Sequence, residues 1–189
     1  MTMLSECRSN EFVGAMPPAG APDLEPLVPR WYAAYTWARH EKSVAKQLEE
    51  RRMDSFLPLY RSWHRWKDRR QQVELPLFSS YVFVRMTLRE RVRVLELPGV
   101  VQLVSFQGRP APLPDLEIEA LRRGLEQEIY AEPHPFLRVG HKVRVRGGPL
   151  AGTEGILLRK KDKLRVVISL EVLMRSIAVE VDAADIGSV

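Results

Sequence analysis

The 189-residue sequence has a single cysteine, Cys7, and four histidines, His40, His64, His134 and His141. One cysteine can neither close an intramolecular disulfide nor supply the thiolates of a structural zinc site. The histidines fall in no grouping typical of acid–base catalysis or metal binding. Phosphate-binding loops and nucleophile-elbow patterns are also missing. We therefore expect a binding protein that is not an enzyme and carries no metal ion or cofactor.

Long hydrophobic runs are missing as well. No apolar stretch approaches the roughly 20 residues that a helix needs to span a bilayer. The first residues lack the basic-then-apolar order of a signal peptide. These absences predict a protein of the reducing cytoplasm with no membrane partner.

Charge is present but unevenly distributed. The formal net charge is +5, and residues 37–70 alone contain ten Lys/Arg against five Asp/Glu. Such a local excess indicates contact with nucleic acid or an acidic protein. The alternative is a solvated basic segment with no partner.

The first 29 residues include five prolines and show no hydrophobic period, which predicts a disordered leader. From residue 30 the pattern changes. Residues 31–36 are typical of a buried strand, 39–53 of an amphipathic helix and 55–60 of a second strand.

Two further strands are expected within residues 61–75, on either side of Lys67-Asp68, as a projecting basic hairpin. Residues 81–84 are dense in residues that favour strands. Thr87 and Glu90 form a capping-box pattern, and the helix after it would bury Val92 and Leu95, with Val94 as a third candidate.

A strand over residues 100–106 and a helix capped by Asp115 complete this part of the chain. The helix carries one apolar stripe, formed by Ile118, Leu121, Leu125 and Ile129. The order of elements over residues 30–130 predicts a ferredoxin-like α+β domain with its helices on one face of the sheet.

Residues 131–137 contain Pro133 and Pro135 and are expected to be a linker. Beyond them, alternation at 141–145, 155–158, 164–170 and 176–181 with intervening glycine turns predicts a small five-stranded SH3-like β-barrel over 138–189. Residues 164–174 contain no helix breaker, so a helix competes there. The β-branched run Val166-Val167-Ile168 favours the strand.

Several stretches now resemble one family. Residues 31–32, 77–84 and 98–100 are similar, in order and spacing, to the N-terminal (NGN) domain of NusG proteins. Residues 139–145 and 148–155 resemble a KOW motif. Within the family, residues 63–69 and 173–180 are similar to the UpxY-type antiterminators, which like RfaH are specialised paralogues of NusG. In one departure, Ser79-Ser80 stands where the family usually has Pro-Gly.

The resemblance implies a monomeric transcription elongation or antitermination factor. Its NGN domain would bind the clamp helices of RNA polymerase and suppress pausing or termination, while its KOW domain would recruit Rho or a ribosomal protein. The residues that match polymerase-binding positions are Trp31, Tyr32, Phe78 and Tyr81. The competing interpretation of these aromatic residues is ordinary core.

Two basic groups are candidates for nucleic-acid binding, including contact with the non-template DNA strand. They are Trp37, Arg39, His40, Lys42 and Lys46 around the first helix, and Arg65, Lys67, Arg69 and Arg70 on the hairpin. In the barrel, Val172, Leu173 and Met174 are candidate partner-binding residues, with barrel core as the alternative.

Two other functions remain open from the sequence. One is a general NusG that couples polymerase to Rho or to the ribosome. The other is a translation-side RNA-binding protein, since KOW barrels also occur in ribosomal proteins; the predicted N-terminal domain argues against it.

Overall fold

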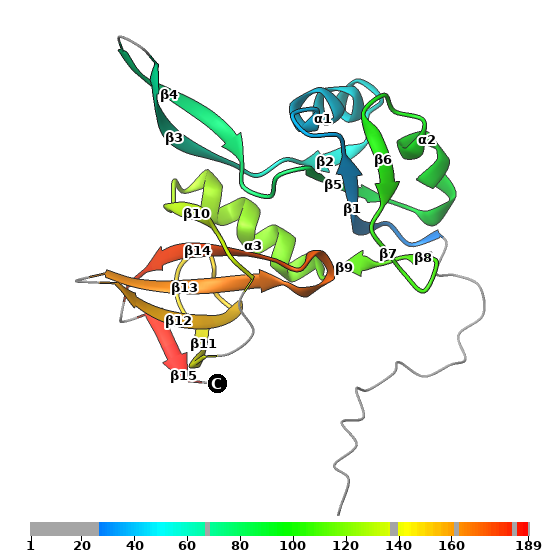
Figure 1. The fold of residues 1–189 in the computed structure, drawn as a ribbon. Coiled ribbons are helices and arrows are strands. Elements are labelled where there is room, and N and C mark those ends of the chain that lie inside the picture. Colours follow the sequence, from blue (N-terminus) through cyan, green and yellow to red (C-terminus); the bar gives the residue numbers. More distant parts are fainter. Residues whose placement is uncertain (1–26, 67–68, 137–139, 161–162, 183–184, 189) are drawn as a thin grey trace, which may run out of the picture.

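The computed structural model describes residues 27–66, 69–136, 140–160, 163–182 and 185–188. An α+β part and an all-β part lie side by side, with one long helix between them (Figure 1). The predicted leader falls outside the described residues except for 27–29, which are exposed. Among the described residues, no helix is both long and apolar enough to cross a membrane.

The N-terminal sheet is antiparallel and has the strand order β2-β5-β1-β6, with β9 pairing to β1. Its strands are β1 (Arg30–Thr36), β2 (Asp54–Phe56), β5 (Tyr81–Met86), β6 (Val100–Leu103) and β9 (Pro112–Leu113). Side chains of β1 and β5 alternate between the two faces, as a pleated strand requires.

Helices cover both faces of this sheet, and the expectation of helices on one face is therefore wrong. The helices α1 (Glu41–Glu50) and α2 (Arg91–Leu95) pack with Tyr32, Val82 and Val84. On the other face, α3 (Asp115–Glu126) packs with Trp31, Ala33 and Phe83. The reason lies in β1, where four successive residues, 31–34, are buried, so both faces need cover.

The turn between β5 and α2 differs in detail from the expectation. The Thr87 backbone N–H donates to Glu90 Oε2 at 2.9 Å, as the capping-box pattern predicts. A 3₁₀ turn, η2 (Leu88–Glu90), precedes α2, which has only five residues. Val94 is buried but Val92 and Leu95 are exposed. A helix of five residues directs only one apolar side chain, Val94, into the core. The expected burial of Val92 and Leu95 is therefore wrong.

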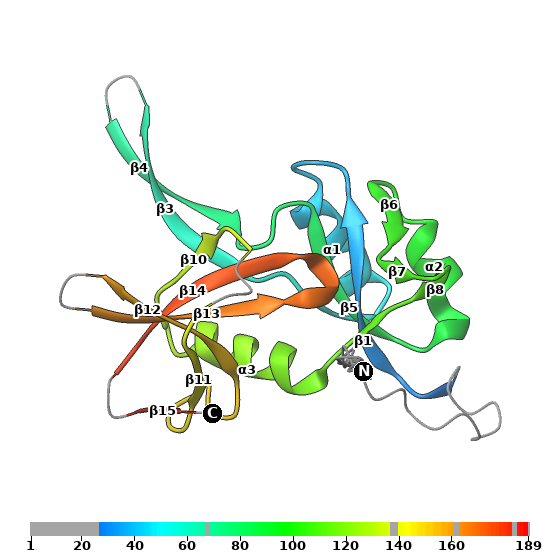
Figure 2. The ribbon, with the colours of Figure 1, turned by 60° about the horizontal axis from the view of Figure 1, so that its bottom comes forward.

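The predicted basic hairpin is confirmed. It consists of β3 (Leu59–Trp66) and β4 (Arg69–Pro76), paired from Leu59↔Pro76 to Trp66↔Arg69. It projects away from both parts of the molecule (Figures 1 and 2). A smaller hairpin, β7 (Ser105–Phe106) and β8 (Arg109–Pro110), lies at the opposite end.

The C-terminal part, which we call the barrel, is a sheet with the order β10-β14-β13-β12-β11-β15. The expected number of five strands is wrong, because β10, which precedes residue 138, pairs with β14 and adds a sixth strand. Its elements are β10 (Ala131–His134), β11 (Lys142–Val145), β12 (Glu154–Lys160), β13 (Lys163–Leu170), the 3₁₀ turn η3 (Glu171–Leu173), β14 (Arg175–Val181) and β15 (Ile186–Ser188). The strand prediction for 164–170 is confirmed over the helical alternative.

The strand β10 occupies the start of the segment that we expected to be a linker. It pairs antiparallel with β14, and Arg165 on β13 holds it there. The Arg165 guanidinium forms ion pairs with Glu132 on β10 and, at 3.0 Å, with Glu180 on β14. The guanidinium also lies 5.5 Å from the Tyr130 ring centroid. Four residues, 127–130, therefore separate α3 from the barrel sheet.

Candidate functional site

Aromatic side chains gather on the α3-facing side of the N-terminal sheet. We call Trp31, Phe56, Phe78, Tyr81 and Phe83 the aromatic face. The Phe83 ring centroid lies 5.6 Å from that of Phe78 and 6.2 Å from that of Phe56. Three chain segments thus converge on one surface. Strand alternation from Tyr81 would have identified Phe83, which the sequence analysis missed.

The four residues expected to bind polymerase do not share one surface. Trp31, Phe78 and Tyr81 belong to the aromatic face, whereas Tyr32 packs on the opposite face with Val44 and Leu48 of α1. Adjacent residues of a strand point to opposite faces, so Trp31 and Tyr32 cannot line the same groove.

The helix α3 covers much of the aromatic face. Arg122 of α3 stacks above the face, with its guanidinium carbon 5.0 Å from the Trp31 ring centroid and 5.2 Å from that of Phe56. Its Nη2 lies 3.2 Å from Asp54 Oδ1. The sequence analysis missed Arg122, although it stands four positions after Ile118 and hence on the same side of the helix.

The burial of the aromatic face is nearly complete. Trp31 is 1% exposed and Phe78 is 2% exposed, while Tyr81 is half-buried. The indole Nε1–H of Trp31 is buried and has no hydrogen-bond partner among the described residues. An unsatisfied buried donor costs about 1–3 kcal/mol. The packing over Trp31 is therefore less stable than it would be if this N–H had a hydrogen-bond partner.

The barrel extends this cover. One continuous apolar cluster contains Trp31 and Phe78 from the sheet, Ile118 from α3 and Leu170 and Leu173 from the barrel. The η3 end of the barrel lies beside the N-terminal sheet (Figure 2). Of the candidate partner-binding residues, Leu173 is buried and Val172 packs against the same cluster, whereas Met174 is 52% exposed.

Close approach of α3 and the barrel depends on Gly124. A Cβ added there would lie 2.9 Å from Leu150 Cδ2 of the barrel. Leu150 is itself buried. Gly124 is therefore a point of close contact between α3 and the barrel, and a larger side chain there would have to displace the buried Leu150 side chain.

The carboxylates of Glu117 and Glu171 lie near each other where α3 meets the barrel. Burial raises the pKa of Glu117 on α3, and the nearby charge of Glu171 on η3 raises this pKa further. Lys142 and Glu154 line the same cavity. The ionised form of Glu117 is thus disfavoured by the closed arrangement.

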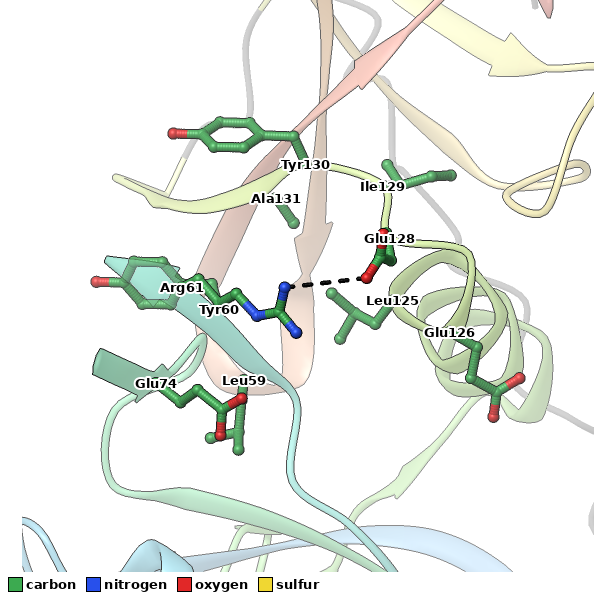
Figure 3. Close-up of a pocket in the computed structure, with 10 residues that line it drawn as sticks. All are labelled: Leu59, Tyr60, Arg61, Glu74, Leu125, Glu126, Glu128, Ile129, Tyr130 and Ala131. Atoms are coloured by element: carbon green, nitrogen blue, oxygen red, sulfur yellow. Dashed lines mark ion pairs between the residues drawn. The ribbon is translucent and has the colours of Figure 1, made fainter. Parts of the chain in front are cut away.

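A second junction joins the hairpin base, the end of α3 and the start of the barrel (Figure 3). A cavity of about 460 Å³ opens between them. Across it, Arg61 Nη1 on β3 lies 3.9 Å from Glu128 Oε1, which follows α3. Both side chains are mainly exposed, so this ion pair contributes little stability but links the hairpin base to the segment leading into the barrel.

The residues expected to bind nucleic acid around α1 are all exposed. Trp37 is 61% exposed, and its ring makes an edge contact with His40 at 5.5 Å. Arg39 adopts a left-handed conformation with φ 64°. Lys42 lies on the solvent side of α1, and Lys46 lies 3.8 Å from Glu50.

On the hairpin, Lys67 lies outside the described residues. The backbones of Arg65, Arg69 and Arg70 lie on β3 and β4, but their side chains are outside the description. Trp63 on β3, which the sequence analysis did not select, is 68% exposed. An exposed indole on a basic arm is the feature that could have drawn attention to it.

The Ser79-Ser80 turn keeps the geometry that a glycine would adopt. Ser80 has φ 67°, in the left-handed region. Its N–H donates to Glu41 Oε1 of α1 at 2.7 Å, and its carbonyl accepts the Thr36 N–H at 2.9 Å. Glu41 is only 5% exposed and was missed by the sequence analysis. These bonds fix the turn that carries Phe78 and Tyr81.

Comparison with known proteins agrees with this architecture. The family model described as "Transcription termination factor nusG" matches residues 29–122. The chain belongs to the NusG family. NusG of Pseudomonas aeruginosa is 25% identical over 86% of this chain and all of its own length, and NusG of Escherichia coli (strain K12) is 28% identical over 83% of this chain and 94% of its own.

Among solved structures, one described as "Domain interaction in Thermotoga maritima NusG" matches with a TM-score of 0.56 at 22% identity, over 87% of this chain and 99% of its own. That likeness concerns the fold. Together, the comparisons identify a NusG-like transcription termination/antitermination factor, in which the matched NGN domain is followed by the β-rich C-terminal part. Among the described residues, no group of three His, Cys, Asp or Glu side chains is placed to hold a metal ion.

Proposed function

We propose that this NusG-family protein is a non-enzymatic cytoplasmic elongation or antitermination factor. Its aromatic face binds the clamp helices of RNA polymerase and thereby suppresses pausing or termination. Its KOW domain recruits a second partner, Rho or a ribosomal protein. One observation carries the proposal: Trp31 on β1 and the Phe78–Tyr81 turn before β5, far apart in the chain, converge on one side of the NGN sheet.

Because these residues are buried, binding of polymerase to the aromatic face requires a change in the protein. Phe78 and Trp31 lie in a cluster that continues through α3 into the barrel, so a polymerase helix reaches them only after the barrel moves away. The unpartnered Trp31 N–H and the opposed Glu117 and Glu171 make this cover weaker than an ordinary core. The described state is then the free, closed form of the protein.

Nucleic acid would lie along the exposed start of α1. Trp37 offers a ring for base stacking, and Arg39, His40 and Lys42 stand beside it in solvent. The basic hairpin would extend along upstream DNA or an acidic polymerase surface. Both contacts predict binding that weakens steeply as salt rises.

The test is a pull-down of the full-length chain on the isolated clamp-helix fragment of polymerase. Tyr81→Ala should weaken binding by about 2 kcal/mol or more, as loss of an interface aromatic anchor does. Leu116→Ala, at a position 76% exposed on α3, is the matched control and should bind normally. Equal binding by both variants, or a melting temperature that collapses with Tyr81→Ala, counts against the proposal.

The second candidate is a general NusG rather than an RfaH- or UpxY-type specialist. The curated relatives favour it, because the P. aeruginosa and E. coli proteins are both described as "Transcription termination/antitermination protein NusG". Residues 63–69 and 173–180 favour the specialist. Stimulation of Rho-dependent termination in a purified system would support the general factor, and readthrough restricted to particular templates would support the specialist.

A further inference from the structure

A cavity lies at the end of β1 that is remote from Trp37. It has a volume of about 600 Å³ and is formed by the start of β1, η2 and the β7–β8 hairpin. Arg30 and Arg109 contribute the charge, while Leu88, Phe106 and Pro110 contribute apolar wall. This cavity belongs to neither the aromatic face nor the α1 surface, and none of the functions considered above uses it.

The charge of the cavity is entirely positive. No carboxylate from the described part of the chain lines it. Neither Arg30 nor Arg109 forms an ion pair with any residue in the described part of the chain. Arg109 is exposed and Arg30 half-buried. Two guanidinium groups that have no counter-charge among the described residues, at the edge of one cavity, favour an anionic ligand.

An exposed aromatic ring stands beside this charge. Phe106 is 72% exposed at the tip of the hairpin. It pairs directly with Arg109 across the two strands, and paired residues of an antiparallel ladder project from the same face. Gln107 and Gly108 make the tight turn, with φ 50° and 77°. The ring and the guanidinium are thus presented together by a short, constrained element.

We propose that this cavity binds single-stranded nucleic acid, with phosphate at Arg30 and Arg109 and a base stacked on Phe106. Guanidinium groups pair with phosphate oxygens, and aromatic faces stack bases with little regard to sequence. The inference rests on the proposed function only in that such a factor works where single strands are exposed. It adds a contact at the other end of β1 from Trp37.

An acidic peptide is the competing ligand. The chain itself carries Asp23 and Glu25 shortly before Arg30. A carboxylate would satisfy the arginines equally well, but it gives no role to a phenyl ring that is mostly exposed to solvent. The Phe106–Arg109 pair therefore favours a ligand that has both a flat ring and a phosphate.

The experiment measures binding of the full-length chain to fluorescently labelled single-stranded DNA and RNA oligonucleotides over a range of salt. Phe106→Ala should weaken binding about tenfold, as loss of one stacked base does. Arg109→Gln should reduce the slope of log affinity against log salt by about 0.7, the value for one phosphate contact on a single strand. Leu116→Ala and Arg175→Gln, both at exposed positions outside the cavity, are the matched controls.

Photo-crosslinking from a halogenated base should map to residues 105–110 if the inference holds. Wild-type affinity in both Phe106→Ala and Arg109→Gln would overturn it, and a loss seen only with Trp37→Ala would leave the proposed function intact. If the two variants instead raise proteolysis of residues 1–26 without changing oligonucleotide binding, the cavity holds the leader and the inference is wrong. Oligonucleotide binding that survives a failed clamp-helix pull-down would retain this site and remove the proposed function.

Discussion

The two faces of the N-terminal sheet are covered in different ways. On one face, α1 and α2 contribute Val44, Leu48 and Val94, all fully buried against Val82 and Val84. On the other, α3 and the barrel cover aromatic rings through a stacked arginine, a glycine contact and two opposed carboxylates. We infer that the first face is permanent core, whereas the second is an interface able to open.

The largest effect should come from the permanent core. Leu48→Ala on α1 removes a fully buried side chain and should lower the free energy of unfolding by about 2–5 kcal/mol, as measured by denaturant titration. Leu173→Ala on η3 removes a buried leucine side chain from the cluster on the other face of the sheet. It should loosen the barrel contact while the NGN domain stays folded. Equal loss of global stability in the two variants would abolish the distinction between the faces.

A bulky residue at Gly124 should open the second face selectively. Gly124→Gln places a good helix former where even a Cβ would crowd Leu150. We expect the domain contact to weaken by about 1–3 kcal/mol, the usual penalty of overpacking. Energy transfer between labels on the two domains should fall and clamp-helix binding should rise. Arg123→Gln, at the exposed neighbouring position, is the control.

The Ser80 turn links the two faces, because Glu41 of α1 holds the segment that carries Phe78 and Tyr81. Ser80→Gly should relieve left-handed strain of about 1–2 kcal/mol, partly offset by the chain entropy of glycine. The net gain is expected to be at most about 1 kcal/mol in thermal unfolding. Ser79→Gly, where φ is not positive, bears only the entropic cost and should not stabilise the protein.

The smallest effect concerns Glu117. Its raised pKa means that the closed form holds the proton more tightly than the open form. The ionised carboxylate therefore weakens the domain contact above that pKa, and the penalty is lost as pH falls through it. Domain closure, followed by the same energy transfer, should increase as the pH is lowered from neutral through the raised pKa of Glu117. Glu117→Gln should remove that dependence, whereas Glu119→Gln, at an exposed position of α3, should preserve it.

Much of the local structure could be predicted from sequence periodicity. The strand at 81–84, the hairpin around Lys67-Asp68 and the apolar stripe of α3 as far as Leu125 follow from short-range patterns. Ile129 was expected on the same stripe, but α3 ends at Glu126, so that part of the prediction is wrong. The strand at 176–181 was expected, but its pairing with β10 could not be predicted, because the charged residues that fix it, Glu132, Arg165 and Glu180, are far apart in the chain. The prolines near residue 133 led us to expect a linker, because the ion pairs that hold β10 in the sheet cannot be recognised from neighbouring residues.

The candidate site was predicted only in part. The resemblance selected Trp31, Phe78 and Tyr81, which do lie on one side of the sheet, but it also included Tyr32, which strand alternation sends to the other side. Arg122, Glu41 and the Phe106–Arg109 pair were missed because each acts through a partner on another strand or helix.

The sequence by itself determined most of the helices and strands, with β10 as the main exception, since hydrophobic period, turn residues and capping patterns act over a few neighbouring positions. Only the tertiary structure decided that α3 lies between the sheet and the barrel and that the aromatic face is covered. The physical reason is that burial and ion pairing depend on which surfaces meet, and the residues that meet here are separated by tens of positions along the chain.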